Sequence, residues 1–362
     1  MSSSVVYVGT YTASLPHVDG RSDGIQIFAF DEGRLEHRVT APSDNPSFLT
    51  TDHANQTLYV VHELLEYGGR EEGGVSAFRM SSDGSLSLLG RRGTGGTGPC
   101  HVSVDRDDRW VFVANYDGGS VAVFPRLENG SLGGLRQFIQ HDGAAMVDAR
   151  RQERAHAHLV RTDPRNRFAY VSDLGLDQVV IYRLTDGVDG DVLVPGPPAF
   201  AAEPGAGPRH LAFAPGGTRA VVINELDSTV VALAVDPEDG SLRALDGAST
   251  LPPGFAGEST CAEVTFSLDG RFVYGSNRGH DSIAVLAFDG DSLEPVEWIP
   301  TGGRTPRHFA FDPTGAWLVA ANQDSGTLVV FSVEPGDGIP RPTGEVVECA
   351  TPVAVHFVPV AS

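Results

Sequence analysis

A short unit that starts at residue 98 decides the fold: GPCHV (residues 98–102) is followed by WVFVAN (110–115) and SVAVF (120–124). Two further copies follow the same order. They are GPRHL (207–211), AVVIN (220–224) and TVVAL (229–233), then TPRHF (305–309), WLVAAN (317–322) and TLVVF (327–331). Each piece is short, rich in β-branched and aromatic residues, and bounded by Gly, Pro, Asp or Asn, which is typical of strands between tight turns. The unit therefore predicts three consecutive short strands.

Looser copies of this unit fill most of the chain. They begin near residues 45, 156 and 261, so that corresponding positions stand at 48, 101, 158, 210, 263 and 308, in steps of 53, 57, 52, 53 and 45 residues. Within a copy, the residue at this position precedes the Asn that ends the second strand by 14 residues, as in His101 to Asn115 and His210 to Asn224. A repeat of about 50 residues, with several strands in each copy, is the signature of a β-propeller.

The two ends of the chain each hold half a copy. VVYVGTY (5–11) matches a second strand with nothing before it, and PVAVHFV (352–358) matches an innermost strand with nothing after it. Joined in one sheet they complete a seventh blade, and this closure removes the open sheet edge. We expect an all-β, seven-bladed β-propeller, one domain over residues 1–362, closed by the N- and C-terminal strands in one blade. Residues 144–155, inserted before the fourth copy, are expected to form a loop with a helical turn.

The charge of the chain excludes several classes of function. The net charge is −21, which disfavours binding to nucleic acid or to anionic membranes. All 26 basic residues are arginines, so there is no Schiff-base lysine and no phosphate-loop lysine. Arginine binds carboxylates and phosphates in a bidentate fork, so a cluster of arginines in this acidic chain would point to a binding site for an anion.

No cofactor or metal site is predicted. His156 and His158 could share a strand face, yet no third ligand is evident, and the GTGGTG run at 93–98 does not precede a helix. The chain has no Gly-x-Ser-x-Gly motif, which argues against a serine hydrolase. Cys100, Cys261 and Cys349 form no CxxC pair, and we find neither a signal peptide nor a long apolar run. These features predict a cytoplasmic protein with reduced thiols.

Comparison between copies separates the scaffold from candidate functional residues. The position after the second-strand Asn carries Tyr116, Leu174, Glu225, Arg278 and Gln323 in successive copies. The scaffold therefore needs no charge there, and Glu225 and Arg278 are departures of the kind by which function is added to a fold. The alternative is that they form a structural ion pair.

The position at which histidines recur supports two interpretations. His101, His158, His210 and His308 all fall there by spacing, so a scaffold role is expected for most of them, while Glu263 is the exception. Arg209 and Arg307 precede this position, where other copies have Ser47, Cys100, Ala157 and Ala262. Three arginines from different blades would bind a carboxylate or phosphate well.

Six short segments together resemble the lactonase-type seven-bladed propeller family. They are YVGTYT (7–12), NPSFL (45–49), HAH (156–158), GPRH (207–210), NEL (224–226) and SNRG (276–279). This family includes propeller-type 6-phosphogluconolactonases and the fungal 3-carboxy-cis,cis-muconate lactonizing enzyme. The resemblance implies a catalytic set of His158, Arg209, Glu225 and Arg278. To this set we add Arg307, His210, His308 and Glu263 as candidate substrate-binding residues.

Three functions follow as hypotheses. The leading one is a lactone hydrolase of the 6-phosphogluconolactonase type, acting on a small anionic lactone or carboxylate, with Glu225 or His158 as the base. A muconate cycloisomerase is the alternative within the family, because its members are similar in these segments. A non-catalytic propeller that binds a protein partner is the alternative from another class. Convergence of Arg209, Glu225 and Arg278 in one pocket would favour an enzyme.

Overall fold

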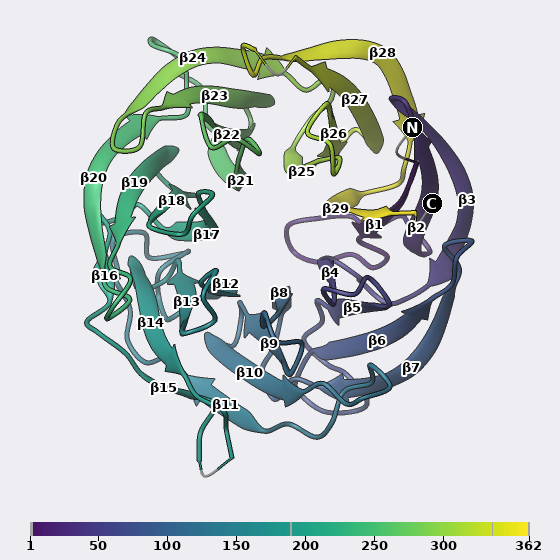
Figure 1. The fold of residues 1–362 in the computed structure, drawn as a ribbon, viewed down its shortest axis with the longest axis vertical. Helices are drawn as coiled ribbons and strands as arrows, with labels where there is room; N and C mark the ends of the chain where they lie inside the picture. Colours follow the sequence, from purple (N-terminus) through teal and green to yellow (C-terminus); the bar gives the residue numbers. More distant parts are fainter. Residues whose placement is uncertain (1–2, 189, 335, 361–362) are drawn as a thin grey trace.

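Seven antiparallel sheets are arranged as a ring in the computed structural model, which describes residues 3–188, 190–334 and 336–360 (Figure 1). Neither an α-helix nor a 3₁₀ helix occurs in this described part, and hence no helix that could cross a membrane. The fold class predicted from the sequence, a seven-bladed β-propeller, is confirmed. The insertion at residues 144–155 is a loop of turns and bends with one helical turn, in which the backbone N–H of Gln152 donates to the carbonyl oxygen of Asp148 at 2.7 Å.

The strands of each blade run in order from the propeller axis to the outer rim. Blade 1 contains β29 (Pro352–Pro359), β1 (Ser4–Thr10), β2 (Gly24–Asp31) and β3 (Arg34–Pro42). Blade 2 contains β4 (Leu49–Thr51), β5 (Thr57–His62), β6 (Gly74–Met80) and β7 (Leu86–Gly93). Blade 3 contains β8 (Pro99–Val104), β9 (Trp110–Asn115), β10 (Ser120–Pro125) and β11 (Gln137–Gln140). Blade 4 contains β12 (Ala157–Thr162), β13 (Phe168–Asp173), β14 (Gln178–Leu184), and β15 (Leu193–Pro195) with β16 (Phe200–Ala201), which both pair with β14.

The remaining blades follow the same order. Blade 5 contains β17 (Pro208–Phe213), β18 (Arg219–Asn224), β19 (Thr229–Val235) and β20 (Leu242–Ser249). Blade 6 contains β21 (Thr260–Phe266), β22 (Phe272–Arg278), β23 (Ser282–Phe288) and β24 (Leu293–Pro300). Blade 7 contains β25 (Pro306–Phe311), β26 (Trp317–Asn322), β27 (Thr327–Val333) and β28 (Pro340–Glu348).

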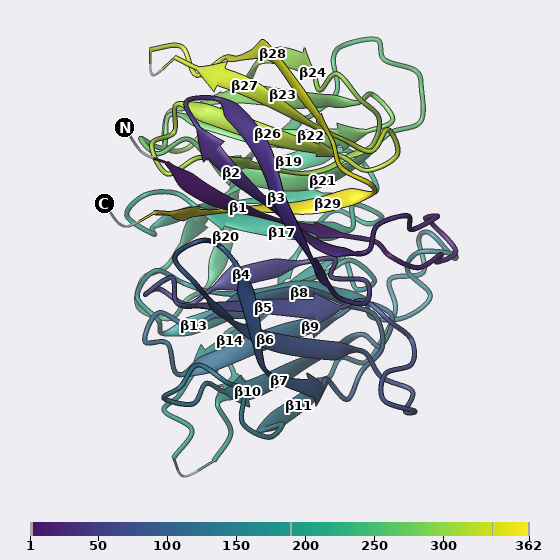
Figure 2. The same ribbon diagram turned by 90° about the vertical axis from the view of Figure 1, so that its right-hand side faces the viewer.

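Strands from the two ends of the chain close the ring. β1 and β29 pair antiparallel, with Val6 opposite Phe357 and Val8 opposite Val355, and Figure 2 shows the two strands side by side. This confirms the predicted closure. It places the start and the end of the repeat in one sheet, in which β29 covers the edge of β1 that would otherwise be free.

The core is divided among the gaps between blades. Seven clusters of buried apolar side chains each join two neighbouring blades, as Tyr7, Ile27 and Leu58 do between blades 1 and 2. The second strand of a blade is therefore buried on both faces, which explains why runs such as WVFVAN in β9 do not alternate with polar residues. Polar groups at strand ends fix the turns: Asp105 Oδ1 accepts the backbone N–H groups of Arg109 and Trp110.

Strand pairing corrects one position in the sequence alignment of the copies. Pro99 lies opposite Asn115 and His101 opposite Ala114, with a register shift at the residue between them. In blade 4, Ala157 lies opposite Asp173 and Leu159 opposite Ser172. Leu159 therefore occupies the position of His101, and the assignment of His158 to that position was wrong by one residue. A shift of one residue reverses the direction of a side chain, so spacing alone could not place His158 correctly.

This register defines two successive levels of residues on the inner strands, called here the upper and the lower ring. The upper ring, at the register shifts, consists of Ser47, Cys100, His158, Arg209, Ala262, Arg307 and Val353. The lower ring, one residue further along, consists of Phe48, His101, Leu159, His210, Glu263, His308 and Ala354.

Candidate active site

A cavity of about 420 Å³ lies at the end of the axis that the upper ring faces. In each blade the inner strand begins and the second strand ends at this level, because the two strands are antiparallel. Residues at both of these strand ends therefore reach the same space. All seven blades or their loops contribute to the lining, which consists of Leu15, Pro16, His17, Glu63, Leu65, Cys100, Tyr116, Asp117, Arg150, Arg151, Glu153, His156, His158, Glu225, Arg278 and Arg307.

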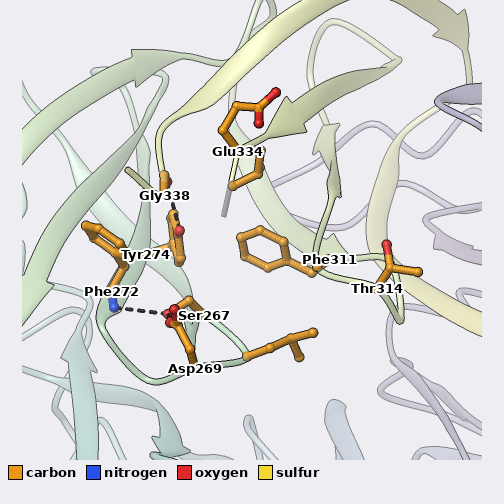
Figure 3. A pocket seen from close by; sticks show the side chains of 11 residues that line it. Ser267, Asp269, Phe272, Tyr274, Phe311, Thr314, Glu334 and Gly338 are labelled. Carbon is orange, nitrogen blue, oxygen red and sulfur yellow. Dashed lines mark hydrogen bonds between the residues drawn. The ribbon is translucent and has the colours of Figure 1, made fainter. Parts of the chain in front are cut away.

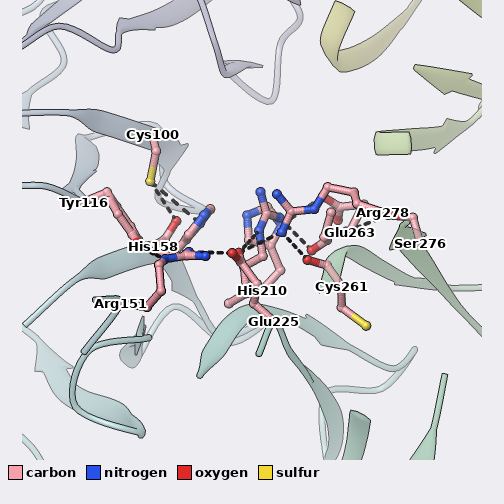
Figure 4. A network of polar contacts seen from close by, with 12 residues as sticks. Cys100, Tyr116, Arg151, His158, His210, Glu225, Cys261, Glu263, Ser276 and Arg278 are labelled. Carbon is pink, nitrogen blue, oxygen red and sulfur yellow. Dashed lines mark hydrogen bonds and ion pairs between the residues drawn. The ribbon is translucent and has the colours of Figure 1, made fainter. Parts of the chain in front are cut away.

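Glu225 lies at the centre of a cluster of arginines. Its Oε1 accepts a hydrogen bond from Arg151 Nη2 at 2.6 Å, and its Oε2 lies 3.0 Å from both Arg209 Nε and Arg278 Nη2. Figure 4 shows Arg151 and Arg278 reaching this carboxylate from two sides. Three guanidinium groups therefore share one carboxylate, and these four side chains together carry a net positive charge.

The charges around Glu225 decide its protonation state. Burial alone would raise its pKa, but Arg278, Arg151 and Arg209 outweigh burial and hold the pKa well below its usual range. Glu225 is thus an anion whose oxygens are occupied by hydrogen-bond donors. Such a carboxylate orients cations well and accepts a proton poorly.

Arg209 lies directly beneath the cavity rather than in its wall. It is 3% exposed and donates from Nη1 to the carbonyl oxygen of Ala262 at 2.6 Å. Burial, reinforced by Arg278, lowers the pKa of Arg209 to about 10, which still leaves the group charged at neutral pH. Together with Glu225 it forms the floor of the site.

Arg307 is the cavity arginine with an uncommitted charge. Its guanidinium lies over the ring of Tyr11, 5.6 Å from the centroid, in a cation–π contact. Within the described residues, no carboxylate forms an ion pair with it. Burial acts to lower the pKa of Arg307, but Tyr11, Glu63 and Glu225 together raise it, so the side chain remains a cation.

His158 reaches the cavity as a neutral imidazole. It is 5% exposed, its Nδ1 lies 3.7 Å from Cys100 Sγ, and its ring makes an edge contact with Tyr116. Burial, then Arg209 and His210, lower its pKa well below the usual range. The ring can therefore exchange hydrogen bonds with a ligand but carries no charge at neutral pH.

Three predicted substrate-binding residues lie below the cavity, in the lower ring. Glu263 Oε2 is 2.8 Å from His210 Nδ1 and 3.3 Å from His308 Nε2. Phe48 and His101 pack against these histidines. This layer separates the candidate site from a wider cavity of about 650 Å³ at the opposite mouth, where Glu263 and His308 also lie. Of the four predicted substrate-binding residues, the structure places only Arg307 in the cavity wall.

A further cavity, of about 160 Å³, lies between blades 6 and 7, away from the axis (Figure 3). Its polar groups pair with one another: Tyr274 Oη donates to the carbonyl oxygen of Gly338 at 2.8 Å, and the Phe272 N–H donates to Ser267 Oγ at 3.0 Å. Because these groups stabilise blade turns, the axial cavity remains the better candidate for chemistry.

Sequence reasoning missed Glu63, Arg151 and Tyr116 as site residues. Glu63 follows β5 as Glu225 follows β18, and the 14-residue step from Phe48 to His62 could have found it. Arg151 lies in the inserted loop, which no repeat predicts, and Tyr116 Oη accepts a hydrogen bond from it at 3.0 Å. No repeat-based argument could have placed Arg151, since its contact with Glu225 spans 74 residues of sequence.

The walls of the cavity differ in charge. Arg151 and Arg278 contact Glu225, whereas Glu63, Asp117 and Glu153 line other parts of the wall. Across the described ranges, no group of three or more His, Cys, Asp or Glu residues is arranged to hold a metal ion. The cavity is therefore polarised, and it suits a ligand with an electron-rich end and several hydroxyl groups.

Comparison with known proteins agrees with this geometry. Residues 5–357 match the model of the family described as "Lactonase, 7-bladed beta-propeller". The 6-phosphogluconolactonase of Bacillus subtilis is 37% identical, and the alignment covers 99% of both chains. The structure of the periplasmic gluconolactonase of Pseudomonas aeruginosa superposes with a TM-score of 0.91 at 34% identity, covering 99% of this chain and 100% of the other. A putative 6-phosphogluconolactonase from Bacteroides fragilis gives a TM-score of 0.89 at 30% identity, with coverage of 99% and 98%. The chain therefore belongs to the lactonase family of seven-bladed β-propellers.

Proposed function

We propose that this protein hydrolyses the ester bond of a sugar lactone, with 6-phosphogluconolactone as the leading substrate. The names of the relatives support this proposal, and they favour hydrolysis over the cycloisomerase alternative. A non-catalytic propeller would have no reason to collect charged groups from several blades in one cavity.

The excess of guanidinium groups around Glu225 is the observation on which this proposal rests. Attack of water on a lactone carbonyl produces a negatively charged tetrahedral oxygen, and preorganised donors at that position lower the barrier. Arg151, Arg209 and Arg278 share one carboxylate, and Arg307 adds a further cation at the same cavity. The chain as a whole has a net charge of −21. A positive cluster at its axis is therefore a local feature of the site and does not reflect the overall charge of the protein.

Roles follow from the positions of these residues. Arg278 would donate to the developing oxyanion, and Arg307 would hold either this oxygen or the phosphate of the substrate. Arg209 and Glu225 would support the clamp from beneath. Because both oxygens of Glu225 already accept hydrogen bonds from arginines, its role is to orient them, and it does not serve as the base.

We also propose a cytoplasmic location, which the three free, buried cysteines support. A structural relative is a periplasmic enzyme, so fractionation of the native host with an antibody against the protein is the appropriate test.

The proposal is tested by a turnover assay with 6-phosphogluconolactone and with the neutral gluconolactone, each corrected for spontaneous hydrolysis. Arg307→Ala is compared with Arg304→Ala, which changes an exposed arginine three residues earlier, in the loop that leads into β25. If Arg307 binds the phosphate, the loss in kcat/KM is large for the phosphorylated lactone and small for the neutral one. If it binds the oxyanion, kcat/KM falls equally for both substrates. Absence of any enzymatic acceleration of either lactone would contradict the proposal.

A further inference from the structure

Two glutamates occupy equivalent positions on different blades of the candidate site. Glu63 comes directly after β5, and Glu225 comes directly after β18. Figure 1 shows these two strands on opposite sides of the ring, and both side chains line the same cavity. The repeat thus sets two carboxylates at the same height on facing walls.

The two carboxylates have different surroundings. Glu225 is held by three arginines, whereas no arginine in the described part of the chain forms an ion pair with Glu63. The hydrogen-bond donor at Glu63 is the hydroxyl of Tyr11, 2.9 Å from Oε1 and 3.0 Å from Oε2. A single hydroxyl proton satisfies only one of these oxygens at a time, so Glu63 keeps acceptor capacity toward the cavity.

The nearest basic side chain does not neutralise Glu63. His17 Nε2 lies 3.9 Å from Glu63 Oε1, beyond hydrogen-bond distance, and its side chain is 48% exposed. Its partial burial, together with Arg307 and Arg278, lowers the pKa of His17 to about 4. The imidazole is therefore neutral at the pH at which a cytoplasmic enzyme works. The carboxylate of Glu63 therefore has no bound counter-charge, and an oxygen of this kind can accept a proton from water.

The position of Glu63 is fixed from two directions. Its backbone N–H donates to the carbonyl oxygen of Asn45 at 3.0 Å, and Asn45 Nδ2 donates to the carbonyl oxygen of Glu63 at 3.2 Å. Its side chain is held by the same Tyr11 whose ring lies under Arg307. One residue therefore sets the spacing between a free carboxylate and a free guanidinium.

We propose that Glu63 is the catalytic base that takes the proton from the attacking water. This inference rests on the proposed lactone hydrolysis and adds a catalytic residue to it. As the O–H bond of water breaks, its proton passes to a Glu63 carboxylate oxygen, and the hydroxide oxygen forms a bond to the lactone carbonyl carbon. The oxyanion collapses, the ring C–O bond breaks, and the departing ring oxygen takes the proton from Glu63. The product is a hydroxy acid, and Glu63 returns to its anionic form.

The test is the kinetics of Glu63→Gln, which keeps the shape and an acceptor for Tyr11 but removes the basicity. We expect kcat on the lactone to fall by about 10²–10⁴-fold with KM nearly unchanged. Glu66→Gln, an exposed carboxylate three residues along the same loop, is the matched control and keeps wild-type kcat. Sodium formate should restore part of the activity of Glu63→Ala, whereas sodium chloride at equal ionic strength should not.

The outcomes separate this inference from the function on which it rests. A wild-type protein that opens no lactone refutes the function itself. An active wild type with an equally active Glu63→Gln refutes only the role of Glu63. If Glu63→Gln fails to fold, Glu63→Asp is measured instead, because it keeps the carboxylate but shortens the side chain by one methylene group. A reduced kcat at unchanged KM then supports the base, and a wild-type kcat overturns it.

Discussion

Three guanidinium groups share the carboxylate of Glu225, and this single residue sets the electrostatics of the site. A buried charge that loses its partners is costly, so the four side chains form one unit. Removal of any one of them changes the pKa and the orientation of the others. Effects of double substitutions within this unit should therefore not add.

The unit makes a prediction about pH. The pKa of Glu225 lies below its ordinary value of 4.5, because Arg278, Arg151 and Arg209 outweigh burial. Its ionised form therefore stabilises the folded state above the unfolded-state pKa, and this contribution is lost as pH falls toward the folded pKa. Glu225→Gln should be less stable than wild type at pH 7, with the difference shrinking below about pH 4.3. Melting temperatures measured at pH 7, 5, 4 and 3 test this, and a difference that stays constant over the range would contradict it.

Tyr11 is a positioning residue for both Glu63 and Arg307. Tyr11→Phe keeps the ring beneath Arg307 and removes the donor to Glu63, so kcat should fall by about tenfold while KM changes little. The matched control is Tyr274→Phe, which removes a hydroxyl that donates to the carbonyl oxygen of Gly338. Tyr274 lies between blades 6 and 7 and does not line the axial cavity. The control should lower the melting temperature and leave kcat unchanged. Equal kcat in both variants would remove Tyr11 from the mechanism.

The repeat explains which site residues could be predicted from the sequence. Glu225 and Arg278 stand out because Tyr116, Leu174 and Gln323, at the equivalent positions of three other copies, carry no charge. Glu63 was missed because its strand ends in His62 and not in the Asn that marks other copies. The register of His158 was missed because the shift that follows Ala157 is a feature of strand pairing, which spacing does not record.

Among the elements, the loop between β11 and β12 has the most direct influence on the site. It carries Arg151 to Glu225, and the buried Gln152 fastens it to blade 4. Gln152 Nε2 donates to the carbonyl oxygen of Leu174 at 3.0 Å and to Asp177 Oδ1 at 2.6 Å. Asp177 in turn accepts the backbone N–H groups of Gly205 and Gly207, which lie between β16 and β17. The loop is thus held by groups that do not line the cavity.

Loss of this anchor should reduce activity without touching the cavity wall. Gln152→Ala removes the donor to two buried acceptors, which costs about 1–3 kcal/mol of stability. Because Arg151 then loses its fixed position, kcat/KM should fall by roughly tenfold. Gln140→Ala provides the control, since this exposed residue at the end of β11 donates to the carbonyl oxygen of Gly118, between β9 and β10. Wild-type kcat/KM in Gln152→Ala would show that the loop does not position Arg151 for catalysis.

At the scale of the whole molecule, each blade is stable only because its neighbours cover both of its faces. The seven apolar clusters lie between blades, and the last gap is closed by the pairing of β1 with β29. The sequence predicted this architecture well, because every copy repeats the same apolar strands and turn residues. That residues 1–362 unfold as one domain stays a prediction.

Truncation after Thr351 tests both the closure and the single domain. It removes β29, exposes the edge of β1 and uncovers Val6 and Val8. The full chain should unfold in one cooperative transition, whereas the truncated chain should aggregate or lose cooperativity. A synthetic peptide of residues 352–359 added in trans should restore part of the lost stability. Two separate transitions in the full chain would argue for two domains, and an unchanged melting temperature after truncation would refute the role of closure.

The most direct test of the account is the rate at which the purified protein opens 6-phosphogluconolactone, measured beside its Arg278→Ala variant with spontaneous hydrolysis subtracted. Arg278 lies at the cavity wall 3.0 Å from Glu225, so its loss should lower kcat/KM by about 10²–10³-fold if it faces the oxyanion. The account predicts a wild-type rate well above the buffer rate and this loss in the variant, with the fold retained. A wild-type rate equal to that of buffer, or a variant as fast as wild type with a lowered melting temperature, would mean that the arginine cluster is structural and would contradict the account.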